Sequence, residues 1–270
     1  MIPCYQIVLG VLVPNQIRLV AIGQDRSEAG MKRALVITLL TLTGAMAAYF
    51  SVSAVAPPTS IHKTNMAERQ DLSGLSVATF AGGCFWCVAA AFQDVPGVRE
   101  AISGFSGGDT ENPSYEQVAY GLTKHTEAVQ VYYDPTQITY EGLLQVLWRT
   151  ADPTDTDGQF SDRGRQYRPA IFYHNEEQRQ VALKSREEVS KSGPYDKPVN
   201  IEIVAYKSFY PAEAYHQDYY KKNPLRYRFY TIGSGRAGFQ LDTWGDDLEV
   251  DFTKYQPKKK TDLAPLAKAM

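Results

Sequence analysis

The spacing of hydrophobic and polar residues predicts alternating short strands and helices from about residue 75 onward. Runs rich in β-branched and aromatic residues are typical of strands, and here such runs are bounded by glycine or polar clusters. We expect strands at Val77–Ala81, Val98–Phe105, Ala128–Tyr133, Pro169–Tyr173 and Val199–Tyr206.

A second periodicity, with apolar residues every three or four positions, predicts helices between several of these strands. It is clearest at 140–150, where Leu143, Leu144, Leu147 and Trp148 share one face. The other predicted helices are Cys84–Asp94, the charged and amphipathic Glu176–Lys191, and Ala212–Lys222.

The order of these elements is irregular, and a long loop at Asp152–Arg168 interrupts it. A doubly wound fold would alternate strands and helices regularly, so we expect an α+β domain with long loop extensions. The chain has 270 residues, of which 44% are hydrophobic, enough for one sizeable core. We place that domain at 76–245, followed at 246–270 by a tail that forms a surface strap or a disordered end.

The segment before this domain has the pattern of an export signal. Lys32 and Arg33 are followed by no charged residue until Lys63, and the intervening chain is apolar and then rich in small residues. A basic start, an apolar run and small residues before the cut are typical of a secretory signal. We therefore expect a signal peptide at 31–56 and a periplasmic protein.

Cleavage after Ala54 is favoured over Ala56, because Pro57 would directly follow the second cut. An uncleaved membrane anchor is the alternative, although the apolar run is short against the ~20 residues that a span needs. Residues 1–30 are then an upstream extension that the native protein lacks, Cys4 included, and 57–75 is a polar linker.

Charge and cysteine content exclude two classes of protein. Lysine and arginine number 28 against 30 aspartates and glutamates, which leaves no basic surface for nucleic acid. Three cysteines in a chain of this length cannot form a disulfide scaffold. The meaning of the cysteines is therefore chemical or incidental.

Cys84 follows Gly82 and Gly83 at the start of a predicted helix. The unpaired N–H groups and the dipole of a helix start favour a thiolate, and can lower a cysteine pKa from about 8.5 to roughly 3.5–7.5. The pattern predicts a nucleophile, and the alternative is an inert packing cysteine. Cys87 has the spacing of a resolving thiol.

Two other interpretations of the cysteine pair remain open at this point. Thioredoxin-like thiol–disulfide oxidoreductases also place Cys-x-x-Cys at a helix start, although an aromatic pair between the cysteines is unusual there. A structural zinc site would need two more ligands, and His125, His174 and His216 are scattered singly. We expect no bound metal, and we interpret His216 as a structural histidine.

The hexapeptide Gly-Gly-Cys-Phe-Trp-Cys at 82–87 resembles the Gly-Cys-Phe-Trp signature of the A-type methionine sulfoxide reductases. The resemblance covers about residues 76–245 and implies a ferredoxin-like two-layer core. It implies reduction of methionine S-sulfoxide, in oxidised proteins and as the free amino acid, with no cofactor except an external thiol reductant such as a thioredoxin-like protein. The family's other blocks are matched, in its order, at 113–118, 124–129, 162–168 and 215–220.

The resemblance also implies roles for individual residues. Cys84 matches the nucleophile, which becomes a sulfenic acid. Glu127 matches the acid that the departing oxygen requires, although composition alone would make it a surface carboxylate. The remaining matches are Tyr115 and Tyr167 as donors to the sulfoxide oxygen, Asp162 as a carboxylate that holds the site, and Phe85 and Trp86 as the methyl pocket.

Recycling is the point at which the chain departs from many members of that family. They carry further cysteines near the C-terminus, whereas this chain has Gly233-Ser234-Gly235 and no cysteine after Cys87. The sulfenic acid on Cys84 is therefore expected to be resolved by Cys87 or by an external thiol.

Overall fold

A computed structural model describes residues 72–257 of the chain. The predictions for the upstream extension, the signal peptide or membrane anchor, most of the linker and the end of the tail lie outside these residues. Among the helices of residues 72–257, none combines the length and apolar character that crossing a membrane requires.

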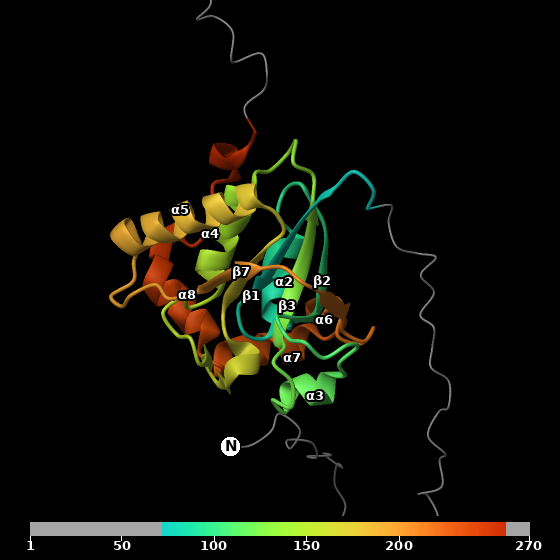
Figure 1. The fold of residues 1–270 in the computed structure, drawn as a ribbon. Helices are drawn as coiled ribbons and strands as arrows, with labels where there is room; N and C mark the ends of the chain where they lie inside the picture. The colour runs from blue at the N-terminus through green and yellow to red at the C-terminus, as the bar shows by residue number, and fades with distance from the viewer. Residues whose placement is uncertain (1–71, 258–270) are drawn as a thin grey trace, which may run out of the picture. The chain divides into compact units, whose positions relative to one another are not determined.

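The centre of the domain is a six-stranded sheet with the order β7-β6-β1-β3-β2-β8 (Figure 1). All neighbouring strands are antiparallel except β6 and β7, which are parallel. A mixed sheet with helices packed on it makes the domain α+β, as predicted. The strands are β1 (Ser76–Ala81), β2 (Val98–Ser106), β3 (Thr126–Tyr133), β6 (Ala170–Tyr173), β7 (Glu202–Ala205) and β8 (Phe209–Pro211), and a separate small sheet pairs β4 (Gly158–Gln159) with β5 (Asp162–Arg163).

The main core lies between this sheet and helices α2 and α4. Phe80 from the sheet, Phe92 from α2 and Leu147 from α4 are all fully buried in it. The helices are α2 (Phe85–Gln93), α3 (Tyr115–Ala119), α4 (Tyr140–Thr150), α5 (Glu176–Ser192), α6 (Tyr219–Lys222), α7 (Pro224–Gly233) and α8 (Arg236–Trp244), with 3-10 turns η2 (Arg165–Tyr167), η3 (Gly245–Asp247) and η4 (Phe252–Tyr255).

Local sequence explains where several of these helices begin. Thr139 precedes α4, and its hydroxyl accepts the N–H of Gly142 at 3.3 Å. Asn175 precedes α5 and accepts the N–H of Gln178 at 2.9 Å. Such caps satisfy N–H groups that have no partner inside the helix. The predicted bounds of both helices accordingly agree with the structure to within one residue.

The prediction of a helix at Ala212–Lys222 is wrong for most of its length, because only Tyr219–Lys222 is helical. Asp218 has a left-handed backbone with a φ of 52°, which a continuous right-handed helix does not allow. The Gln217 side chain instead bonds the backbone N–H and carbonyl of Ser103 on β2, at 2.9 and 2.8 Å. The segment at 212–218 is therefore a non-helical connection that runs beside β2.

A second difference between prediction and structure also has a distant bonding partner as its cause. The predicted strand Val199–Tyr206 is paired only over β7, because the N–H of Asn200 donates to the loop carbonyl of Pro153 at 2.9 Å instead of to a strand.

The pattern predicts neither α7 nor α8. On α7, Leu225 and Phe229 are exposed while its tyrosines turn inward, so the helix lacks the apolar stripe on which such a prediction rests.

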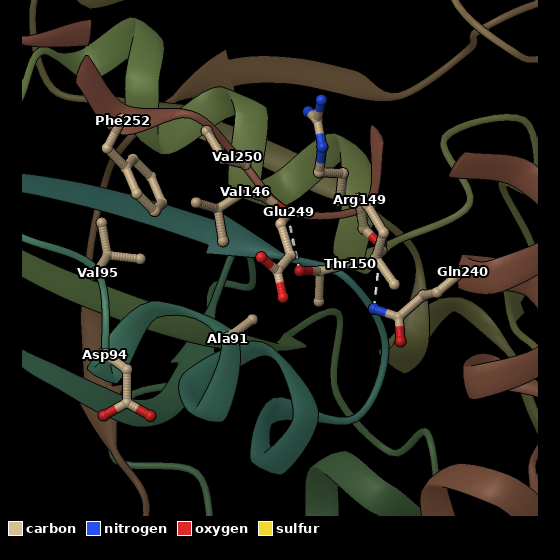
Figure 2. A pocket seen from close by; sticks show the side chains of 11 residues that line it. Ala91, Asp94, Val95, Val146, Arg149, Thr150, Gln240, Glu249, Val250 and Phe252 are labelled. Carbon is tan, nitrogen blue, oxygen red and sulfur yellow. Dashed lines mark hydrogen bonds between the residues drawn. The ribbon is translucent and has the colours of Figure 1, made fainter. Parts of the chain in front are cut away.

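The described part of the tail packs as a strap beside α4. The carbonyl of Tyr255 accepts the N–H of Thr139 at 2.9 Å, and the partly buried Val250 and Phe252 pack on the core. Beneath them lies a cavity of about 450 Å³ (Figure 2). It is lined by residues of α2, α4, α8 and the strap, among them Ala91, Val95, Val146, Thr150, Gln240 and Phe252.

Candidate active site

The site is built around the turn that joins β1 to α2. Gly83 has a φ of 82°, and a Cβ atom there would lie 2.5 Å from the Cβ of Gln159. Only glycine combines this left-handed conformation with so close an approach. The turn places Cys84 as the residue before the first turn of α2, with 5% of its surface exposed. The predicted position of this cysteine at a helix start is therefore confirmed.

The first turn of α2 takes its cap from a distant strand. Cys84 makes no side-chain cap, and the N–H of Phe85 donates instead to Oε2 of Glu127 on β3 at 2.9 Å. Glu127 is 2% exposed, and this burial raises its pKa to about 8. The carboxyl group is therefore largely protonated at neutral pH, beside the cysteine and able to donate a proton.

The two thiols are both buried, free and hydrogen-bonded to each other. Burial raises the pKa of Cys84, and the thiol of Cys87 and the negative groups nearby act in the same direction. The expectation that the helix start lowers the Cys84 pKa is thus wrong for the substrate-free protein, because desolvation outweighs the helix dipole. The pKa of Cys87 is lowered, chiefly by the hydrogen bond from Cys84.

Asp162 and Tyr167 complete the polar side of the site. The hydroxyl of Tyr230 donates to Oδ2 of Asp162, and burial raises the pKa of Asp162. Burial also raises the pKa of Tyr167, and the carboxyl group of Glu127 adds to this effect. The Tyr167 hydroxyl therefore remains a neutral donor next to Glu127, Tyr115 and Cys84.

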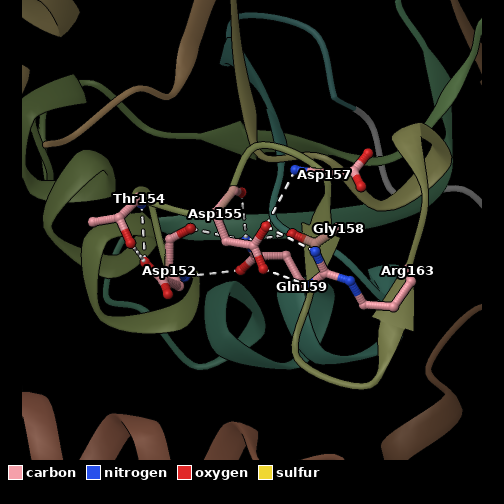
Figure 3. A network of polar contacts seen from close by, with 7 residues as sticks. All are labelled: Asp152, Thr154, Asp155, Asp157, Gly158, Gln159 and Arg163. Atoms are coloured by element: carbon pink, nitrogen blue, oxygen red, sulfur yellow. Dashed lines mark hydrogen bonds and ion pairs between the residues drawn. The ribbon is translucent and has the colours of Figure 1, made fainter. Parts of the chain in front are cut away.

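A network within the loop before β5 holds Asp162 in place (Figure 3). The fully buried Gln159 accepts the N–H of Asp152 and donates to the Asp152 carbonyl, both at 2.8 Å. Asp155 and Arg163 form a two-pronged ion pair at 2.5 and 3.0 Å. These contacts close the loop on both sides of Asp162, and Gln159 also packs against Gly83.

The opposite side of the site is aromatic. The ring of Phe85 lies 5.0 Å from the ring of His216 and 6.2 Å from that of Tyr115, while Trp86 stacks on Tyr219 at 3.8 Å. The structure thus brings the predicted Phe85, Trp86 and Tyr115 together in one wall. Such a wall fits an apolar methyl group next to the thiol.

His216 belongs to this wall as a buried, hydrogen-bonded ring, which agrees with its interpretation as a structural histidine. Its Nδ1 accepts the indole N–H of Trp86 at 3.0 Å, and burial lowers its pKa to about 4. The ring is therefore neutral, and its proton is assigned to Nε2 because Nδ1 is the acceptor. The block Tyr-His-Gln-Asp-Tyr-Tyr at 215–220 was the signal that marked this segment.

Three further residues of the site have no signal in the sequence pattern. Tyr230 contacts Asp162, the hydroxyl of Tyr227 bonds the thiol of Cys87, and the guanidinium group of Arg236 lies near both Cys87 and Asp162. All three come from α7 and α8, which fold back to the site from the far end of the domain.

The remaining histidines serve separate local contacts. Nδ1 of His125 accepts the N–H of Gly108 at 3.1 Å, and Nε2 of His174 lies 2.8 Å from the Thr79 hydroxyl. Across residues 72–257 no three side chains of the His, Cys, Asp and Glu types are grouped as metal ligands.

Comparison with known proteins gives consistent sequence matches. The family model described as peptide methionine sulfoxide reductase matches residues 76–248. The peptide methionine sulfoxide reductase MsrA of Bacillus licheniformis is 51% identical over 180 residues, which cover 67% of this chain and 97% of that protein. The enzyme of the same name from Listeria innocua is 53% identical over 170 residues, or 63% and 96% of the two chains.

Two solved structures resemble the described domain. Mxr1 from Saccharomyces cerevisiae in reduced form superposes with a TM-score of 0.54 at 30% identity, over 58% of this chain and 90% of that one. Methionine sulfoxide reductase A of Corynebacterium diphtheriae gives a TM-score of 0.51 at 36% identity, over 57% and 77%.

Proposed function

The chain belongs to the peptide methionine sulfoxide reductase family and reduces methionine S-sulfoxide to methionine, and from this premise we propose how its residues divide the reaction. The thioredoxin-like alternative is not favoured by these matches. The observation that carries the proposal is the buried carboxyl group of Glu127, held 2.9 Å from the N–H next to Cys84.

In the first step, the sulfur of Cys84 attacks the sulfoxide sulfur. The new sulfur–sulfur bond and the substrate's sulfur–oxygen bond then break as the protonated oxygen passes to the Cys84 sulfur, so methionine leaves and Cys84 becomes a sulfenic acid. The thiol sulfur is oxidised by two electrons and the sulfoxide sulfur is reduced by two. One thiol and one sulfoxide thus give one sulfenic acid and one methionine, with no other reactant.

The departing oxygen must be protonated, and Glu127 supplies the proton. A general acid works best when its pKa lies near the working pH, and burial brings that of Glu127 to about 8. The hydroxyl groups of Tyr115 and Tyr167 hold the sulfoxide oxygen, and Asp162 holds the far side of the site through Tyr230. Phe85 and Trp86 take the methyl group.

In the second step, Cys87 resolves the sulfenic acid. Its sulfur attacks the sulfur of Cys84, the sulfur–oxygen bond breaks, and the oxygen leaves as water with the thiol proton. Residues at i and i+3 of a helix share a face, and the hydrogen bond between the two thiols places them in contact. An external dithiol, such as a thioredoxin-like protein, then reduces the disulfide by exchange.

The mechanism is tested in a single turnover. Reduced protein mixed with one equivalent of methionine S-sulfoxide, without reductant, should release one methionine and lose two thiols, with a Cys84–Cys87 disulfide in the peptide map. The R epimer is the control and should leave both thiols intact. Release of methionine with a lasting sulfenic acid on Cys84 would reject Cys87 as the resolving residue.

We also propose that the protein acts outside the cytoplasm, as a periplasmic enzyme repairing exported proteins. Lys32, Arg33 and the apolar run behind them support a signal peptide at 31–56, with a membrane anchor as the alternative. Mass spectrometry of the native protein from a periplasmic fraction should find an N-terminus near residue 55. Cytoplasmic protein that begins at Met1 would contradict the proposal.

The finer description of the fold is likewise a proposal. We assign the core as ferredoxin-like, a class in which two β-α-β units interleave. The strand order β6-β1-β3-β2 with antiparallel neighbours supports this, as do α2 between β1 and β2 and α4 between β3 and β6. An experimental structure with another strand order would overturn it.

A further inference from the structure

Three large apolar side chains lie along the outer face of α7. Leu225, Phe229 and Ile232 are 72%, 75% and 59% exposed. Their spacing of four and then three residues places them on one stripe of the helix. The opposite side carries Tyr227 and Tyr230, whose hydroxyl groups reach the active site. The helix therefore directs its tyrosines inward and an apolar stripe outward, and an exposed stripe of this kind is typical of an interaction surface.

Two arginines flank this stripe, one on each side. Arg226 follows Leu225 and Arg228 precedes Phe229, and successive helix residues are about 100° apart, so the two side chains leave the helix on opposite sides of the stripe. Both are exposed, and no carboxylate of residues 72–257 lies within ion-pair distance of either. A long arginine side chain can cover apolar surface while its charged end stays in a polar layer.

The charge of this segment differs from that of the chain as a whole. Residues 219–235 contain two lysines, two arginines and no aspartate or glutamate, whereas the formal charge of the chain is -2. Lys221 pairs with Asp218 at 3.5 Å, which leaves the two arginines as the unpaired cations beside the stripe. An occupant of this face must therefore be apolar in the middle and negatively charged on both sides.

Two occupants from this chain do not meet that requirement. The run at 34–62 has no acidic residue and is flanked by Lys32, Arg33 and Lys63, so it would bring cations to cations. A second copy of α7 related by a twofold axis would place arginines opposite arginines. Like charges at close distance repel each other, so neither occupant fits.

We propose that this face of α7 docks on the surface of a membrane that contains anionic lipids. Such a surface has apolar acyl chains beneath a layer of negative headgroups, which matches an apolar stripe with a cation on each side. The contact is peripheral, and it holds the active site about one helix diameter, roughly 10–12 Å, from the lipid. Oxidised methionines at the membrane surface are then the nearest substrates. That consequence rests on the proposed function, whereas the docking itself does not.

The test uses the full chain with a tryptophan probe in the stripe, Phe229→Trp, and vesicles of phosphatidylglycerol and phosphatidylcholine in equal amounts. The signal of the wild type, which has three tryptophans, is subtracted. Bromine on the acyl chains quenches tryptophan only at contact, so the probe reports on α7 even where another segment binds lipid. Brominated vesicles should lower the emission of the probe at least about twofold relative to ordinary ones. Val204→Trp, at a 39% exposed position on β7, is the matched control and should show no difference.

Charge removal tests the role of the arginines. Arg226→Gln/Arg228→Gln in the probe variant should raise the lipid concentration at half-maximal quenching by about tenfold or more, because each cation near an anionic surface adds to binding. Lys184→Gln/Lys191→Gln removes the same charge from exposed positions on α5, which lies across the domain from α7 (Figure 1), and should change it less than about twofold.

Equal emission of Phe229→Trp on brominated and ordinary anionic vesicles would overturn the proposal, as would equal effects of the two charge-removing variants. Where Arg226→Gln/Arg228→Gln does not fold, quenching of the single probe variant that is unchanged in 1 M salt, where the Debye length is about 3 Å, overturns it alone. A response of the probe to an acidic thioredoxin-like donor, with none to vesicles, would overturn it in favour of a protein partner. Absence of sulfoxide turnover would instead reject the proposed function and leave the quenching unchanged, so the two failures are distinguishable.

Discussion

Helix α2 begins among buried ionisable side chains and ends beside a pocket lined by apolar side chains and by charged ones that are exposed or partly exposed. At its start lie Cys84, with Cys87 one turn on, and the buried carboxyl group of Glu127. Near its end, Ala91 and Val95 line the cavity beside the strap at 248–252. Thr150 and Gln240 bond backbone carbonyls there, and the carboxylates of Asp94 and Glu249 are exposed. Segments from the C-terminal part of the domain cover both ends of α2, but they have different effects at the two ends.

The start of the helix is covered by groups whose protonation depends on burial. Excluding water there raises the pKa of Glu127 and Cys84 and so prepares an acid and a protonated nucleophile. At the other end, Val250 and Phe252 contribute packing, and the carboxylates of Asp94 and Glu249 remain exposed. Substitutions at the start should therefore change rates, and substitutions at the end should change stability.

The largest effect is expected for Cys84→Ser. A serine hydroxyl does not form a stable sulfenic acid equivalent, so turnover of methionine S-sulfoxide should fall by at least about a thousandfold. The circular dichroism spectrum should match that of the wild type, because the two side chains are similar in size. Turnover close to wild type in the folded variant would end the assignment of the nucleophile.

Glu127→Gln should rank second, with the chemical step slowed by about 10²–10⁴. In the wild type, the single-turnover rate should fall as pH rises through about 8, because the proton on Glu127 is lost there. The variant should lack this limb. Glu177→Gln, an exposed change on α5, is the control and should behave as wild type.

The raised pKa of Glu127 also predicts how the free energy of unfolding changes with pH. The folded protein keeps a proton on Glu127 that the unfolded chain releases above about pH 4.5, so the free energy of unfolding should fall as pH rises from there toward about 8. Denaturant titrations at several pH values measure this slope. A slope equal in wild type and Glu127→Gln would place its origin elsewhere.

Cys87→Ser should have a smaller and more selective effect. One methionine per site should still be released, because Cys84 carries the first step. Steady-state turnover with a thioredoxin-like donor should then drop by about tenfold or more, and dithiothreitol should restore part of it by direct attack on the sulfenic acid. Full-speed cycling with the protein donor would make Cys87 a packing residue.

Trp86→Phe tests the aromatic wall. It removes the indole donor and leaves Nδ1 of His216 unpartnered, which should lower the free energy of unfolding by about 1–2 kcal/mol. Because Trp86 belongs to the proposed methyl pocket, we also expect a higher KM, with kcat changed less. A fall in kcat at constant KM would instead place Trp86 in the chemical step.

The smallest effect on rate is expected at the far end of α2. Phe252→Ala removes a half-buried ring that packs over the cavity, and should lower the free energy of unfolding by about 1–2 kcal/mol. Turnover should stay within about twofold of wild type. A large loss of activity without loss of stability would show that the two ends of the helix are coupled.

Much of the fold follows from local pattern. The strand and helix predictions around β1, β2, β3, β6, α4 and α5 are confirmed, since alternation and capping residues act over a few positions. Prediction failed at 212–218 and at α7 and α8. There, distant partners such as Ser103 for Gln217 and Asp162 for Tyr230 decide the backbone course.

The candidate site likewise has one part that the local sequence predicts and one part that it does not. The glycine turn, Cys84 at the helix start, and Phe85 and Trp86 beside it are contiguous, so one hexapeptide contains them. Glu127, Tyr115, Tyr167 and Asp162 were predicted only through a family resemblance, and the structure brings them to Cys84. The spacing of these residues along the chain contains no information on their distance in space.

By itself, the sequence determined which residue types are present and where short-range elements begin, because hydrogen bonding in turns and caps is local. Only the tertiary structure decided the charge of the site. Desolvation depends on what covers a group from every side, and the buried guanidinium of Arg236 bonds the carbonyl of Gly82, from which it is separated by more than a hundred residues of chain. The helix dipole favours a Cys84 thiolate, but the surrounding burial raises the pKa of that thiol.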